Sequence, residues 1–317
     1  MLNGYGGRQA TPSRDPLAAQ TFLTHYMILL QTLPPADTLL PFPVALGFVA
    51  TLGAMIGSFL NVVIHRLPRE ESIVFPNSRC PSCGTAIRPY DNIPVISYAL
   101  LRGRCRSCRT PISARYPAVE LLVAALFALV FWHDRVTFAL PFDLLFVAAL
   151  AALVFIDAEH MILPDVITLP GIGLALVARA LVPNLYGLGF LSGGLLGGTP
   201  DWTVSLAGAL LGALAGGGSL WLIGFLWERL RGVEAMGLGD VKMMFMVGAY
   251  LGWAHTALTI FLAVITGSLV GVALMLRRGE RDMQMMLPFG IFLGAGAIIS
   301  LLAGHALIGW YVGRFAP

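Results

Sequence analysis

Long apolar segments alternate with short polar ones along most of the 317-residue chain. Many of the apolar segments approach the roughly 20 residues that a helix needs to cross the hydrocarbon core of a bilayer. The pattern therefore predicts an all-α polytopic membrane protein with about eight transmembrane helices. The expected helices cover residues 43–64, 118–132, 138–156, 165–181, 203–227, 241–253, 256–276 and 288–307, of which 241–253 is short and is predicted to cross only partly or at a tilt.

The composition agrees with this pattern. Hydrophobic residues make up 57% of the chain and charged residues 12%, whereas an average soluble domain carries about 25% charged residues. The net charge of +3 is explained by basic loops beside a membrane more simply than by nucleic-acid binding. We therefore expect membrane lipid, and no nucleic acid, around this chain.

The arginines are concentrated in one polar region. Residues 65–116 contain nine arginines and three acidic residues, and an excess of positive charge marks the cytoplasmic loops of membrane proteins. We expect four regions: an unassigned N-terminal extension at 1–42, in which no signal-peptide cleavage site is recognisable, a first transmembrane helix at 43–64, a cytoplasmic domain at 65–116, and a transmembrane domain at 117–317. The basic clusters near 229–242 and 277–281 fall on the same side in this topology.

All four cysteines lie in the polar region. They form two C-x2-C pairs, Cys80 with Cys83 and Cys105 with Cys108, separated by 21 residues. Two such pairs can close a tetrahedral, structural zinc site, and the metal would supply folding energy that a small polar domain lacks. Disulfides and free thiols are the alternatives, of which disulfides are disfavoured on a cytoplasmic face.

Two aspartates stand at the edges of apolar segments. Asp157 follows one segment, and Asp240 precedes another after Gly237 and Gly239. With helices alternating in direction, both carboxylates reach the cytoplasmic boundary. Two carboxylates in a partly dry site share a proton, so that one can activate water while the other polarises a peptide carbonyl. The glycines would let an extended peptide approach the backbone.

Structural interpretations of these residues remain open. Asp157 can solvate a helix end, and Asp240 can be an N-cap. Lys242, the only lysine, can hold an ionised carboxylate or an anionic substrate group, or serve as a positive-inside anchor. Asp165 competes with Asp157 for a catalytic role, but it follows a proline and is typical of a helix start.

Other chemistries have weaker support. The chain has no H-E-x-x-H pattern for a catalytic zinc. Ser58 and Ser219 lie beside glycines, which is ordinary in membrane-helix packing. A non-enzymatic transporter or secretion scaffold would use membrane acids as a proton path, and this predicts carboxylates in mid-span rather than at one edge.

The chain resembles the bacterial type IV prepilin peptidases, which are bifunctional leader peptidases and N-methyltransferases. The resemblance runs from about residue 45 to 295, and it includes a G-x-G-D motif at 237–240. One departure is His65, where the family more often has tyrosine. The stretches that carry the resemblance, in chain order, are 57–68, 78–81, 91–98, 101–105, 115–121, 156–160, 163–165, 237–242 and 287–290.

The resemblance implies an aspartic endopeptidase of the bacterial inner membrane whose active site faces the cytoplasm. Asp157 and Asp240 would be the catalytic pair, supported by Gly237, Gly239 and Lys242. The substrates would be prepilins or pseudopilins of type IV pilus or type II secretion systems, cut after a glycine at the end of a short basic leader. Residues 117–317 would form the peptidase domain.

The resemblance also implies a second activity. The new N-terminal amine would be methylated with S-adenosylmethionine as donor, and this activity goes with the zinc-binding cytoplasmic domain at 65–116. Gly103, Arg104 and Glu120 are expected near methyl transfer, with a structural role as the alternative for each. A peptidase that lacks methyl transfer also remains compatible with the sequence.

Overall fold

The computed structural model describes residues 40–183, 200–233, 236–278 and 287–315. Most of the expected N-terminal extension at 1–42 and part of the basic cluster at 277–281 lie outside the described residues. The chain divides into residues 1–45 and residues 46–317. The second unit is described below.

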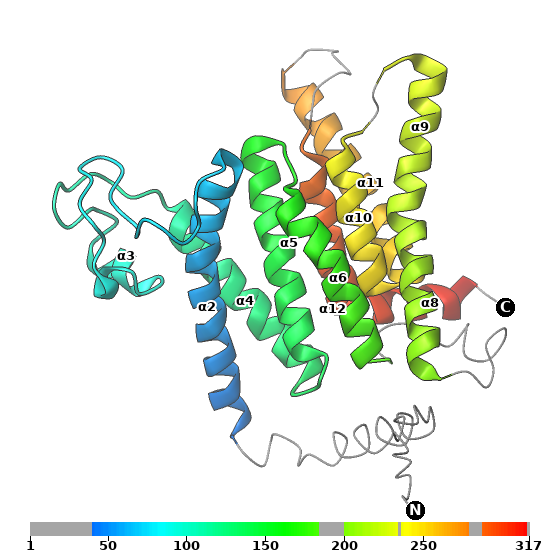
Figure 1. The fold of residues 1–317 in the computed structure, drawn as a ribbon, viewed down its shortest axis with the longest axis horizontal. Coiled ribbons are helices and arrows are strands. Elements are labelled where there is room, and N and C mark those ends of the chain that lie inside the picture. The colour runs from blue at the N-terminus through cyan, green and yellow to red at the C-terminus, as the bar shows by residue number, and fades with distance from the viewer. Residues whose placement is uncertain (1–39, 184–199, 234–235, 279–286, 316–317) are drawn as a thin grey trace, which may run out of the picture. The chain divides into compact units, whose positions relative to one another are not determined.

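Helices account for nearly all of the described apolar sequence, which confirms the all-helical class (Figure 1). Every expected segment falls on a helix. The expected segment 203–227 is α8 joined to α9 through the π-helical turn η4 (Leu214–Gly218). The long helices are α2 (Phe42–Arg66), α4 (Arg115–Asp134), α5 (Leu140–His160), α6 (Asp165–Leu181), α8 (Asp201–Ala213), α9 (Ser219–Arg231), α10 (Leu238–Leu251), α11 (Trp253–Arg278) and α12 (Phe289–Phe315).

Six helical segments of the described chain are long and apolar enough to cross a membrane: 42–69, 115–134, 140–160, 201–231, 253–277 and 289–315. The other two expected spans are shorter. α6 has 17 residues and α10 has 14, below the roughly 20 that a perpendicular crossing needs. The shortness expected of 241–253 is thus confirmed.

α10 is the helix around which the others pack. It contacts α6, α8, η4, α9, α11 and α12, and Met243, Met244 and Val247 are completely buried. Its closest approach is to α8, where a Cβ added to Gly212 or to Gly248 would lie 2.1 Å from a backbone oxygen of the other residue. Small residues allow this kind of close helix contact in membrane proteins.

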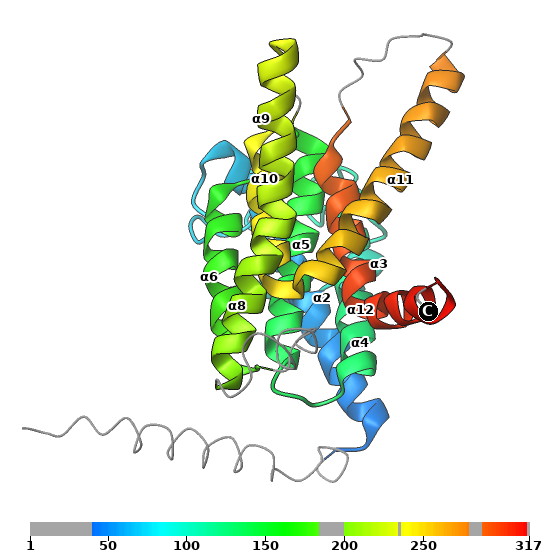
Figure 2. The same ribbon diagram turned by 90° about the vertical axis from the view of Figure 1, so that its right-hand side faces the viewer.

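The alternating helices bring several termini to one end of the bundle. This end, called the aspartate end below, consists of the C-terminus of α5 and the N-termini of α6, α10 and α12 (Figure 1). The C-terminal ends of α9 and α11 project beyond it and diverge (Figure 2). Asp157 and Asp240 therefore belong to the same end of the bundle, as the sequence predicts.

The polar region between α2 and α4 has little regular structure. It contains the short helices η2 (Leu67–Arg69), η3 (Pro89–Asp91) and α3 (Ile96–Leu100). Two isolated antiparallel bridges, Arg79 with Ala86 and Arg104 with Pro111, each enclose one C-x2-C pair. Few of its apolar side chains are buried, which agrees with a domain that depends on something other than a hydrophobic core.

Candidate active site and metal centre

Asp157 is buried in the last turn of α5, with 5% of its surface exposed. Its carboxylate oxygen Oδ2 accepts a hydrogen bond from the backbone N–H of Ile291 at 3.2 Å. Ile291 is in the first turn of α12, where unpaired N–H groups and the helix dipole favour a negative charge. The aspartate end of α12 thus holds the Asp157 carboxylate in place.

Glycine is required where α12 meets this carboxylate. A Cβ on Gly290 would lie 2.8 Å from Oδ2 of Asp157 and 3.2 Å from Cδ1 of Leu163. Gly290 ends the 287–290 stretch of the sequence, so the structure gives that stretch a physical role: it lets the start of α12 approach the aspartate.

Asp240 lies in the first turn of α10 and is partly exposed. The N-cap of α10 is Gly237, and no side chain caps this helix. The interpretation of Asp240 as an N-cap is therefore wrong, and its carboxylate is not used for capping. Leu163 connects the surroundings of the two aspartates: a Cβ on Gly239, next to Asp240, would lie 2.9 Å from its Cβ, and a Cβ on Gly290, which packs against Asp157, would lie 3.2 Å from its Cδ1.

The two glycines before Asp240 have different surroundings. Gly239 packs against Leu163, whereas Gly237 is exposed, and a Cβ added there would have no neighbour closer than 4.0 Å. Gly237 thus leaves open backbone beside the Asp240 carboxylate, and Gly239 serves helix packing.

Lys242 holds an ionised carboxylate, but it is that of Asp165. Its Nζ donates to both oxygens of Asp165 at 2.8 Å, which joins the second turn of α10 to the first residue of α6. The Asp165 side chain is 53% exposed and starts a helix, as the sequence predicts. Its charge is balanced by Lys242, in contrast to Asp157.

A second ion pair joins the polar region to the aspartate end. Arg115, the first residue of α4, pairs with Glu159, two residues after Asp157. Both side chains are about 30% exposed. The contact fixes the end of α5 against the start of α4.

The four cysteines form one cluster of free thiols. All four Sγ atoms lie within 4.8 Å of one another, and those of Cys80 and Cys108 are 3.8 Å apart. A tetrahedral zinc with Zn–S bonds of about 2.3 Å separates its sulfurs by about 3.8 Å. The donor set and its spacing therefore fit a metal ion such as zinc, and the cluster contains no disulfide.

The two halves of the cluster repeat one local structure. Each follows the pattern C-x-S-C-x-T, and the N–H of the first cysteine donates to the threonine carbonyl at 2.9 Å, in Cys80 to Thr85 and Cys105 to Thr110. The Thr110 hydroxyl and amide lower the pKa of the Cys108 thiol to about 6, which favours the thiolate form that binds metal. The sequence itself contains this short repeat.

Of the three residues expected near methyl transfer, Glu120 and Gly103 make structural contacts. Glu120 is 9% exposed, and its Oε2 accepts a hydrogen bond from the Val95 N–H at 2.7 Å, just before α3. Gly103 has φ +66°, and a Cβ there would lie 2.9 Å from the Tyr98 hydroxyl. Arg104 is exposed. Glu120 and Gly103 thus contact opposite ends of the same segment, from Val95 to Tyr98.

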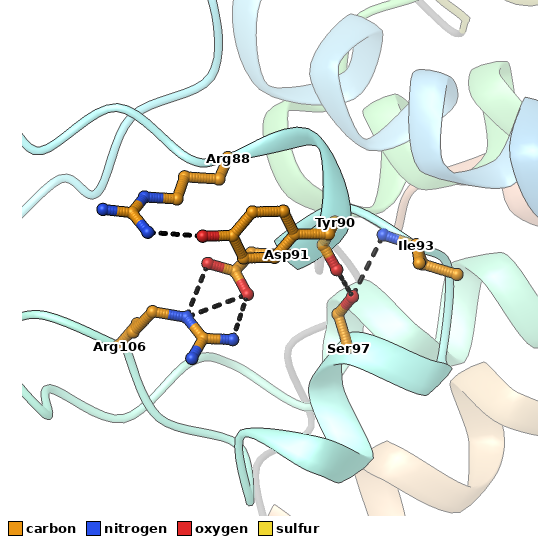
Figure 3. A network of polar contacts seen from close by, with 6 residues as sticks. All are labelled: Arg88, Tyr90, Asp91, Ile93, Ser97 and Arg106. Atoms are coloured by element: carbon orange, nitrogen blue, oxygen red, sulfur yellow. Dashed lines mark hydrogen bonds and ion pairs between the residues drawn. The ribbon is translucent and has the colours of Figure 1, made fainter.

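A polar network at η3 was missed by the sequence reasoning (Figure 3). Arg106, from the second cysteine pair, donates to both oxygens of Asp91 through Nε at 3.0 and 2.8 Å. This hydrogen bonding holds the pKa of Asp91 below its usual value. Tyr90 lies between the guanidinium groups of Arg88 and Arg106, 5.8 and 5.5 Å from its ring centroid. The network connects η3 to the cysteine cluster.

A buried polar contact near the first turn of α5 was also missed. Asp143 is completely buried, and one of its carboxylate oxygens accepts a hydrogen bond from the Tyr250 hydroxyl at 2.9 Å. Arg179, in the last turn of α6, is completely buried as well. A charged residue inside an apolar segment is the signal that could have found this contact.

Family models match most of the chain. Residues 51–134 match the Bacterial Peptidase A24 N-terminal domain, and residues 144–272 match the Type IV leader peptidase family. A prepilin leader peptidase/N-methyltransferase of Pseudomonas aeruginosa is 38% identical, covering 88% of this chain and 98% of its own. A protein with the same name from Burkholderia pseudomallei is 38% identical, over 84% of this chain and 87% of its own. Another from Aeromonas hydrophila is 38% identical, over 85% of this chain and 94% of its own. No solved structure matches.

Proposed function

The chain belongs to the type IV leader peptidase family, and from that premise we propose that it is a prepilin leader peptidase and N-methyltransferase of the bacterial inner membrane. The observation that carries the proposal is the arrangement of Asp157 and Asp240. They come from α5 and α10 at one end of the bundle, where Gly239, next to Asp240, and Gly290, which packs against Asp157, both lie against Leu163.

Hydrolysis requires these two carboxylates in different protonation states. Two neighbouring carboxylates in a partly dry site share one proton. The ionised aspartate takes a proton from water, which attacks the scissile carbonyl, while the protonated one donates a hydrogen bond to the carbonyl oxygen. Collapse of the tetrahedral intermediate transfers a proton to the leaving amine. The Ile291 N–H bond to Asp157 supports Asp157 as the aspartate that is ionised first.

The substrate would be the leader segment of a prepilin or pseudopilin. The arginine-rich region between α2 and α4 favours a cytoplasmic position for the aspartate end, so cleavage occurs where a basic leader remains inside the cell. Exposed backbone at Gly237 offers room for an extended peptide beside Asp240. Lys242 contributes indirectly, by fixing α6 to α10 through Asp165.

Methyl transfer would follow cleavage. The new N-terminal amine would attack the sulfonium methyl group of S-adenosylmethionine, so that an N–C bond forms while the S–CH3 bond breaks, S-adenosylhomocysteine leaves and the amine loses a proton. Cys80, Cys83, Cys105 and Cys108 would hold a structural zinc that maintains the fold of the polar region. Glu120 and Gly103 would act by shaping the segment around α3, and Arg104 is exposed for contact with the donor.

One experiment tests both activities. The purified full-length protein is reconstituted in lipid vesicles with a prepilin and methyl-labelled S-adenosylmethionine. We expect a shortened pilin that carries the label on its N-terminal amine, and cleavage without label when the donor is omitted. Cleavage that never leads to label would show a peptidase alone, and neither product would indicate a non-enzymatic membrane component.

A further inference from the structure

The short helix α3 is held level with the interior turns of a membrane-spanning helix. α4 has 20 residues, and at 1.5 Å per residue it is about 30 Å long, about the thickness of the hydrocarbon core. Glu120 lies five residues after Arg115, so it is about 7.5 Å inside the helix. Its carboxylate binds the N–H of Val95, the residue that precedes α3. The start of α3 therefore cannot lie far out in the water phase.

A second contact sets the depth of the same region. The Asn61 side-chain amide donates to the Tyr116 carbonyl at 3.0 Å, and Asn61 is five residues before the end of α2 at Arg66. α2 and α4 are thus level at this point. Figure 1 agrees, because it shows α3 beside α2 rather than beyond its end.

The α3 segment carries apolar side chains that the described part of the chain leaves largely exposed. Ile93, Ile96 and Leu100 are 45%, 56% and 77% exposed. Ile96 and Leu100 are four residues apart in α3, which places them on one face of the helix, and Ile93 lies just before the helix. Ser97 faces the opposite way: it is buried, and its hydroxyl donates to the Tyr90 carbonyl and accepts from the Ile93 N–H.

We propose that α3 is an interfacial helix, and that Ile96 and Leu100, with Ile93 just before the helix, insert into the cytoplasmic leaflet beside α2 and α4. The occupant of this face is the lipid of the surrounding membrane. Amphipathic segments with apolar residues on one side and basic residues nearby lie in the headgroup boundary of membranes.

Charge supports lipid as the occupant. Arg102 and Arg104 follow α3 directly and are exposed, and anionic headgroups attract arginines at a membrane surface. A soluble protein partner would have to reach a helix that is tethered to the second turn of a membrane span. Lipid already surrounds that turn. The interfacial helix would therefore anchor the cysteine cluster on the membrane, close to the aspartate end.

The test uses the wild-type full-length protein in vesicles of phosphatidylethanolamine and phosphatidylglycerol that contain a photoactivatable phospholipid, with the reactive group near the start of the acyl chain. Lipid adducts are mapped on peptides by mass spectrometry. Residues 93–100 should carry about tenfold more adduct than residues 81–88, since only the former enter the interface. The comparison segment contains Ile87, which is 40% exposed and controls for simple exposure of an apolar side chain.

The double variant Ile96→Ser, Leu100→Ser removes the apolar side chains of α3 that should insert into the membrane. It should reduce adducts on 93–100 several-fold while the metal content and the adducts on α2 stay unchanged. Equal labelling of 81–88 and 93–100, or no labelling of 93–100, would overturn the proposal. Crosslinks between α3 segments of two copies in place of lipid adducts would overturn it too. None of these readouts depends on peptidase or methyl-transfer activity.

Discussion

The carboxylate of Asp157 accepts a hydrogen bond from the backbone N–H of Ile291, a residue 134 positions later in the chain. This contact makes the start of α12 part of the site, although α12 supplies no acidic residue at that end. It also explains why the aspartate at the end of α5 and the glycine at the start of α12 are needed together: the carboxylate occupies the space that a Gly290 side chain would fill.

Gly290→Ala should therefore reduce leader cleavage strongly. The added Cβ would lie 2.8 Å from Oδ2 and 3.0 Å from Cγ of Asp157, so the carboxylate must move, and a misplacement of about 1 Å at a catalytic group can slow a reaction on the order of 100-fold. Methylation of a pilin that has already been cleaved should persist. The measurement is the initial rate of each reaction in vesicles.

Gly309→Ala is the matched control on the same helix. No atom lies within 4 Å of a Cβ built at Gly309, so alanine is accommodated there, and both rates should equal those of the wild type. Normal cleavage by Gly290→Ala would contradict the role given to the start of α12.

The Lys242–Asp165 ion pair should contribute modestly, because both partners are substantially exposed. Exposed pairs typically contribute about 0–1 kcal/mol. Lys242→Met and Asp165→Asn should each lower cleavage less than about tenfold. The double variant should lose no more than either single one, because all three remove the same contact. If Asp165→Asn instead abolished cleavage as completely as a substitution of a catalytic residue, Asp165 would become the candidate for the aspartate that activates water.

Cys80→Ser with Cys83→Ser should remove the metal. Two of four ligands are lost, and the remaining thiolates cannot complete a tetrahedral site. Elemental analysis of purified protein should find about one zinc per wild-type chain and much less in the variant. Ser82→Ala, between the two cysteines, should keep the metal. Stoichiometric zinc in the Cys80, Cys83 variant would refute the site.

The helices and their order could be predicted from sequence because apolar segments of membrane length have one common outcome, the helix. The cysteine cluster could be predicted as well, since two C-x2-C pairs bring their thiols together through local turns. The bounds of α6 were predicted correctly at 165–181, but hydropathy could not predict the complete burial of Arg179 in its last turn. It depends on which helices surround it.

The tertiary contacts of the site escaped prediction for a related reason. Nothing local marks Ile291 as the donor to Asp157, or Asp165 as the partner of Lys242, because each pair joins different helices. No local sequence pattern marks the π-helical turn η4. It arises where glycines let α8 and η4 approach α10.

Tyr250→Phe should destabilise the protein without changing its chemistry. It removes the hydrogen bond to the buried Asp143 but keeps the ring stacked on Phe146, 4.2 Å between centroids. Removing a hydrogen bond from a buried carboxylate costs about 1–3 kcal/mol of folding free energy. The thermal unfolding midpoint in detergent should fall, and the cleavage rate at a temperature well below that midpoint should stay normal. A selective loss of cleavage would connect this contact to the active site.

The most direct test of the central claim is the cleavage rate of Asp157→Asn and of Asp240→Asn on a prepilin, with both proteins reconstituted in vesicles and their metal content and unfolding midpoint measured alongside. Asp134→Asn, at the C-terminal end of α4, is the matched control and should cleave normally. Each of the two active-site variants should lose cleavage by at least about 1,000-fold while remaining folded and metal-bound. Cleavage at a normal rate by either variant would contradict the assignment of the two aspartates as the catalytic pair.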